Sequence, residues 1–142
     1  GTALNYPTKV GMENALEALK NQNFEYEIIV AGYGTACLSH YSNKNISILG
    51  EITDSELFDL MQYSKCLIIN QVQTSGFLTK IVDFNLSGIP IILTSNYFQS
   101  NNLERYGVYK SGFAGLEQTI DNLPDQFAYN YFKEPTLDLF SI

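Results

Sequence analysis

The strongest chemical signal is a run of hydroxyl, glycine and lysine residues at positions 73–80, Gln-Thr-Ser-Gly-Phe-Leu-Thr-Lys. It follows a short apolar run typical of a strand and opens an amphipathic helix. Exposed amides at a helix N-terminus, the close approach that Gly76 permits, and Lys80 one turn later suit an anion. The pattern therefore predicts a phosphate site; the alternative is that Ser75 only caps the helix and Gly76 only serves the turn.

Asp83 lies three residues after Lys80 and eight after Ser75, so it falls on the same side of the predicted helix as Thr79. A carboxylate at this position could accept hydrogen bonds from sugar hydroxyls in the same crevice. The alternative is a solvated helix face with a weak Lys80–Asp83 ion pair.

A second glycine pattern, Gly32-Tyr33-Gly34, follows an apolar run and resembles the start of a dinucleotide-binding fingerprint. Cys37 stands where the third glycine would be, and no clear helix is predicted after it. Glu51 comes about twenty residues later, where the ribose-binding acid of such domains is expected. An NAD-type domain is therefore an alternative.

Metal binding and thiol chemistry are not predicted. The chain has two cysteines and one histidine, too few for a thiolate-rich zinc site. Cys66 lies within an apolar run, so we expect a core residue rather than a reactive thiol. His40 is given no role. Reduced thiols, and the lack of a signal-like leader before the first helical pattern, favour a cytoplasmic domain excised from a longer protein.

The elements that must position these residues alternate along the chain. Helices are predicted from near Pro7 to Leu19 and over 53–63, 77–86, 116–120 and 125–132, and strands over 26–31, 46–49, 66–69, 89–93 and 107–109. The helix at 53–63 has a capping box, Thr53 with Glu56. The polar segment 35–45 is judged too short for a helix.

Short buried strands separated by helices indicate an α/β fold, a doubly wound, mainly parallel Rossmann-like sheet with helices on both faces. Residues 1–142 are expected to form a single such domain. Ligands bind such sheets beyond the carboxyl ends of the strands, here the loops after residues 31, 49, 70 and 94.

Composition excludes some partners. With 8 basic against 15 acidic residues the net charge is −7, the wrong sign for binding nucleic acid through a basic surface. No apolar run approaches the roughly 20 residues that span a bilayer, so no transmembrane segment is predicted.

In this order, the motifs resemble the C-terminal, nucleotide-sugar-binding domain of GT-B-fold glycosyltransferases, of the large group 1 (family 4-like) retaining family that includes many capsule and lipopolysaccharide enzymes. The resemblance extends from residue 1 to about 125. It rests on residues 1–7 as an opening strand and turn, the glycine turn at 29–34, the segment 48–52, the helix 53–63, the donor loop and helix at 75–84, and the Gly-x-Pro-hydrophobic-Thr strand at 88–94.

The resemblance implies a donor-binding site. The amides of Ser75, Gly76, Phe77 and Leu78 would meet the diphosphate of a UDP- or GDP-linked sugar, together with Lys80. Asp83 would stand where a Glu holds the ribose, Gly50 and Ile52 would flank the base, and Lys9 is a candidate phosphate contact. The family often has two glutamates eight residues apart, whereas this chain has Ser75 and Asp83.

The resemblance also implies a missing partner. The family's active site lies between two domains, and the N-terminal acceptor-binding half, expected to hold part of the catalytic residues, is not in this sequence. The full-length parent would be a hexosyltransferase of surface polysaccharide synthesis, with no obligatory cofactor or metal. The parent would be cytoplasmic, or peripheral at the inner face of the membrane. The isolated domain would bind without catalysing; a degenerate, non-catalytic interaction module is a further alternative.

Overall fold

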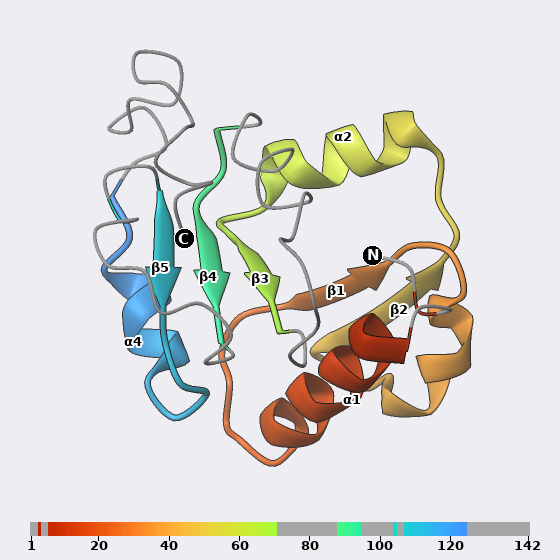
Figure 1. The fold of residues 1–142 in the computed structure, drawn as a ribbon, viewed down its shortest axis with the longest axis horizontal. Coiled ribbons are helices and arrows are strands. Elements are labelled where there is room, and N and C mark those ends of the chain that lie inside the picture. The colour runs from red at the N-terminus through yellow and green to blue at the C-terminus, as the bar shows by residue number, and fades with distance from the viewer. Residues whose placement is uncertain (1–2, 4–5, 71–87, 95–103, 105–106, 125–142) are drawn as a thin grey trace. The chain divides into compact units, whose positions relative to one another are not determined.

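A computed structural model describes residues 3, 6–70, 88–94, 104 and 107–124 of the chain (Figure 1). The chain divides into two compact units, Gly1–Leu60 with Asn70–Gln73, and Met61–Ile69 with Thr74–Ile142. Each unit has a small, wholly parallel sheet, so the protein is of the α/β class. The predicted single domain stays a prediction.

The first unit is built on two parallel strands, β1 (Ile28–Ala31) and β2 (Ile46–Gly50), which pair from Ile28 opposite Ile46. Helix α1 (Tyr6–Lys20) begins one residue before Pro7, a position where proline's missing N–H costs no hydrogen bond. Its inner face packs with the strands around a core cluster of Leu16, Leu38 and Ile46, joined by partly buried Met12, Ile28, Val30, Tyr41 and Ile48.

The connection between β1 and β2 contains a helix, so the expectation of no helix in this segment was wrong. Thr35–Tyr41 forms a 3-10 helix, η1. Gly34 precedes it with a φ of 81°, a left-handed conformation that glycine adopts without penalty. The buried hydroxyl of Thr35 donates to the carbonyl of Gly32 at 2.7 Å. These local bonds close the turn, and Leu38 then reaches the core.

Helix α2 (Asp54–Tyr63) starts as predicted, at a capping box. The Glu56 amide donates to the Thr53 hydroxyl at 3.1 Å, and the Thr53 amide donates to the Glu56 carboxylate at 3.0 Å. No residue of α2 is buried against the described part of the chain, and Phe58 is 62% exposed. The start of this helix therefore depends on its cap more than on packing.

Thr53→Ala is expected to lower the free energy of unfolding by about 1 kcal/mol, because the Glu56 amide loses the hydroxyl that accepts its hydrogen bond. Urea unfolding followed by circular dichroism measures the change. Thr53→Ser keeps the hydroxyl and should stay within about 0.5 kcal/mol of the parent. Equal losses in both variants would show that the methyl group, and not the cap, matters.

The second unit holds a three-stranded parallel sheet in the order β3 (Leu67–Ile69), β4 (Ile91–Leu93), β5 (Val108–Lys110), followed by helix α4 (Leu116–Asp121) (Figure 1). The central strand β4 is buried along its whole length, as expected of a parallel strand with a neighbour on each side. Leu116 and Ile120 give α4 its buried positions.

All five predicted strands are confirmed. Each strand begins and ends no more than two residues from its predicted bounds, and every pairing is parallel. They form two separate sheets, and the doubly wound arrangement stays a prediction. The expectation that every strand is buried was wrong for the first unit, where Ile29 is 42% and Leu49 48% exposed. The helices predicted over 77–86 and 125–132 lie outside the described residues. No helix within the described ranges is long and apolar enough to span a membrane.

Candidate functional site

The carboxyl ends of β1 and β2 lie together, because parallel strands end at the same edge of a sheet. The register shifts between Val30 and Ala31, so that Ala31 pairs with Gly50 and Leu49 has no partner in β1. Just beyond, the amide of Gly32 donates to the carbonyl of Gly50 at 2.8 Å. The glycine turn after β1 and the end of β2 thus meet through their backbones.

Glycine is required at this edge by the backbone conformation. Gly32, Gly34 and Gly50 have φ values of 134°, 81° and 75°, in the region that side chains disfavour. Gly50 is buried, and a Cβ built on it would lie 3.7 Å from the Cβ of Ala36, an ordinary contact. The constraint at Gly50 is therefore its conformation rather than lack of space. We call the edge formed by residues 31–34 and 50–52 the glycine edge.

Gly50 and Ile52, which the resemblance places beside the base of a nucleotide, both belong to the glycine edge. Ile52 is partly buried, and Glu51 between them is exposed. An exposed carboxylate there could accept hydrogen bonds from hydroxyl groups of a ligand. Gly50 and Ile52 are thus the predicted site residues that the structure places at the glycine edge.

Lys9, the candidate phosphate contact, lies in the second turn of α1. Its Nζ is 3.6 Å from a carboxylate oxygen of Glu13, one helical turn on, and both side chains are partly exposed. A weak, solvent-exposed pair of this kind can be exchanged for a ligand anion at little cost.

The other predicted site residues, Ser75, Gly76, Phe77, Leu78, Lys80 and Asp83, lie outside the described residues. Their donor-loop role stays a prediction. The described chain reaches Asn70, whose side-chain amide donates to the carbonyl of Gly11 in α1 at 2.7 Å. The residue that precedes the predicted loop is thus fixed to the first helix.

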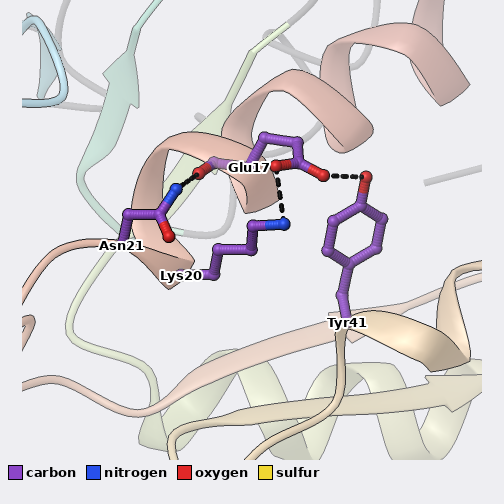
Figure 2. Close-up of polar contacts among 4 residues, drawn as sticks. All are labelled: Glu17, Lys20, Asn21 and Tyr41. Atoms are coloured by element: carbon purple, nitrogen blue, oxygen red, sulfur yellow. Dashed lines mark hydrogen bonds and ion pairs between the residues drawn. The ribbon is translucent and has the colours of Figure 1, made fainter.

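A surface cluster that the sequence did not suggest joins the end of α1 to η1 (Figure 2). The hydroxyl of Tyr41 donates to Glu17 at 3.0 Å, and the Lys20 ammonium lies 2.7 Å from the other oxygen of that carboxylate. The hydrogen bond from Lys20, and then that from Tyr41, lower the pKa of Glu17. The ring of His40 lies 4.3 Å from that of Tyr41. Because these groups satisfy one another, we assign them a structural role.

The two cysteines differ in their environments, and that of Cys66 makes its thiol less reactive. Cys37 is exposed on η1, whereas partial burial raises the pKa of the Cys66 thiol from 9.0 to about 11. The raised pKa agrees with the predicted unreactive thiol, whereas the expectation of a core residue was only partly right, because Cys66 is partly exposed. Among the described residues no three acidic, histidine or cysteine side chains gather as a metal site would need.

Cys37 is exposed and should therefore react with Ellman's reagent at about pH 8, whereas Cys66 should not, because its raised pKa keeps it in the unreactive thiol form. The reaction of Cys66 should begin only as the pH approaches 11 or when urea unfolds the chain. Since the folded state holds this proton longer, stability falls as pH rises from the thiol's unfolded value towards about 11. Cys37→Ser should leave no fast-reacting thiol in the folded protein; a fast phase in that variant would contradict the assignment.

Comparisons of the chain with protein-family models, with curated proteins and with solved structures give no match. The fold and the local geometry are therefore what a functional proposal can be based on. Together they define an α/β protein with a glycine-lined backbone edge at the carboxyl ends of two parallel strands.

Proposed function

We propose that the chain is the nucleotide-sugar-binding half of a glycosyltransferase, with a doubly wound sheet and a donor linked to UDP or GDP. The observation that carries the proposal is the hydrogen bond from the Gly32 amide to the Gly50 carbonyl at the glycine edge. It brings two strand ends together without side chains, at the edge where open α/β sheets bind ligands. A nucleotide can approach backbone closely there.

The rest of the proposal comes from the sequence alone. The amides of residues 75–78 and the ammonium of Lys80 would bind the diphosphate, which the dipole of the predicted helix would also stabilise. The Asp83 carboxylate would accept hydrogen bonds from the ribose hydroxyls. As the sugar leaves, negative charge grows on the nucleoside diphosphate, and these fixed positive groups would stabilise it. The acceptor would be a glycan or a lipid-linked sugar held by a separate N-terminal domain, in the cytoplasm or at the inner face of the membrane.

One observation favours a second candidate, an NAD-type domain. The Gly32-Tyr33-Gly34 turn is followed directly by the helical segment η1, and Glu51 is exposed at the next strand end. A helix after the turn and an acid at the second strand end are parts of a dinucleotide site. The short 3-10 helix and the exposed Cys37 at the third glycine position count against this candidate.

Ligand-observed NMR of the purified chain against UDP, GDP, CMP, ADP and NAD, each at about 1 mM, tests the proposal at the weak affinity expected of half a site. UDP or GDP should give signals that weaken about tenfold or more in Asp83→Ala and in Gly76→Val. Asp59→Ala, an exposed aspartate on α2, is the matched control and should bind as the parent. A response to NAD alone would favour the second candidate, and silence with every nucleotide would overturn both.

A further inference from the structure

Tyr33 stands out at the glycine edge as a large ring that the described chain leaves uncovered. It sits between Gly32 and Gly34, directly after β1, and is 54% exposed. Some rings of the first unit pair with a neighbour, Phe24 at 5.7 Å from Tyr26 and His40 at 4.3 Å from Tyr41, whereas Tyr6 and Phe58 are exposed as Tyr33 is but lie away from the glycine edge in the sequence. For Tyr33, no ring contact and no side-chain hydrogen bond with another described residue is present.

The backbone that carries Tyr33 is fixed on both sides. Its own carbonyl accepts a hydrogen bond from the amide of buried Ala3 at 2.9 Å. The carbonyl of Gly32 accepts from both the amide and the hydroxyl of Thr35, at 3.1 and 2.7 Å. Thr35 is completely buried, so these bonds are shielded from water. The turn thus holds the backbone of Tyr33 in place, so that a ligand contacting the ring has only the side-chain torsions to order.

The neighbourhood of Tyr33 suits a flat ligand group. Gly50 is bonded to the adjacent Gly32 and presents no side chain, and Ile52 follows as a partly buried apolar residue. Tyrosine rings stack on the faces of heteroaromatic rings, and any nucleobase has such a face. A phosphate gains nothing from a ring face, and a sugar can contact one only through its C–H groups.

We propose that Tyr33 is a base-stacking residue: the nucleobase of the bound nucleotide lies on its ring, with Gly50 and Ile52 beside it. This inference rests on the proposed function and adds the group that holds the base. With this contact, the affinity of the site depends on the nucleobase as well as on the phosphates. Since stacking tolerates any base and strengthens with ring size, GDP should bind more tightly than UDP through this contact.

The test compares UDP, GDP and inorganic pyrophosphate on the full chain by NMR titration. In the parent, base protons should shift upfield on binding, as they do above an aromatic face. Tyr33→Leu should bind both nucleotides about tenfold more weakly and lose the shift, with pyrophosphate affinity unchanged. Tyr33→Phe keeps the ring, so it should retain the nucleotide affinity and the upfield shift of the base protons. Tyr63→Leu, a 91% exposed tyrosine on α2, is the matched control.

The outcomes separate the two proposals. If the parent binds nucleotides and Tyr33→Leu binds them equally well with the same base-proton shifts, stacking is refuted while the proposed function stands. If Tyr33→Leu weakens pyrophosphate as much as the nucleotides, the residue only supports the turn, and the stacking role is again refuted. If the parent binds no nucleotide, the proposed function fails and the inference fails with it.

Discussion

Leu38→Ala is expected to lower the free energy of unfolding by about 2–5 kcal/mol, the largest stability loss we predict for a single side chain. Leu38 has no exposed surface and lies in the core cluster with Leu16 and Ile46. Leu38 is the fully buried residue through which η1 joins that cluster, and Tyr41 of η1 packs against the cluster only in part. Urea unfolding followed by circular dichroism gives the change in midpoint.

The matched control for Leu38 is Leu49, which lies at the shifted register position and is 48% exposed. Leu49→Ala should cost less than about 1 kcal/mol, because water already covers half of the side chain. The slope of the unfolding transition should be the same in both variants. Equal losses at the two positions would mean that the cluster around Leu38 does not hold the first unit together.

Gly50→Val should abolish measurable nucleotide binding and lower the free energy of unfolding by about 1–3 kcal/mol. The φ of 75° at Gly50 is an outlier for a β-branched residue, so the strand end must change conformation or remain strained. Either change alters the carbonyl that accepts the hydrogen bond from Gly32. Thermal unfolding and NMR titration with UDP and GDP measure the two effects on the same sample.

Gly112→Val is the control for Gly50, because a Cβ at Gly112 meets nothing within 4 Å among the described atoms. That variant should keep the stability of the parent to within about 0.5 kcal/mol and bind nucleotide as before. Binding by a folded Gly50→Val protein with the affinity of the parent would remove the glycine edge from the proposed site.

Elements defined by local chemistry were predictable. The start of α2 follows from Thr53 and Glu56, which satisfy each other's amides within one turn. The strands follow from short apolar runs between polar breaks. Among the strands that pair, a helix was predicted only between β3 and β4, over 77–86, so the sequence offered a reason for that parallel pairing and none for β1 with β2 or β4 with β5. The helix η1 was missed because a 3-10 turn leaves no 3.6-residue pattern, and its stabilising bond runs from Thr35 back to Gly32.

Features set by distant residues were not predictable. The contact between Tyr41 and Glu17 joins positions 24 apart, and no local pattern marks it. The apolar character of Ile29 did not reveal that its side of β1 is uncovered, since Ile28 and Val30 take the side facing the core. For the site, the resemblance implied Gly50, but the hydrogen bond between its carbonyl and the amide of Gly32 depends on the register shift. The donor-loop residues 75–83 lie outside the described residues, so their role rests on the sequence alone.

The core cluster has a consequence for how the chain acquires its structure. Every member of the cluster lies between Met12 and Ile48, so its contacts span short stretches of sequence. Closing a loop costs more entropy the longer the loop is, so contacts within this segment cost less than contacts across the whole chain and can form early in folding. During synthesis the ribosome will have released the whole of this segment well before β4 and β5 emerge, so the glycine edge can take shape while most of the second unit is still untranslated.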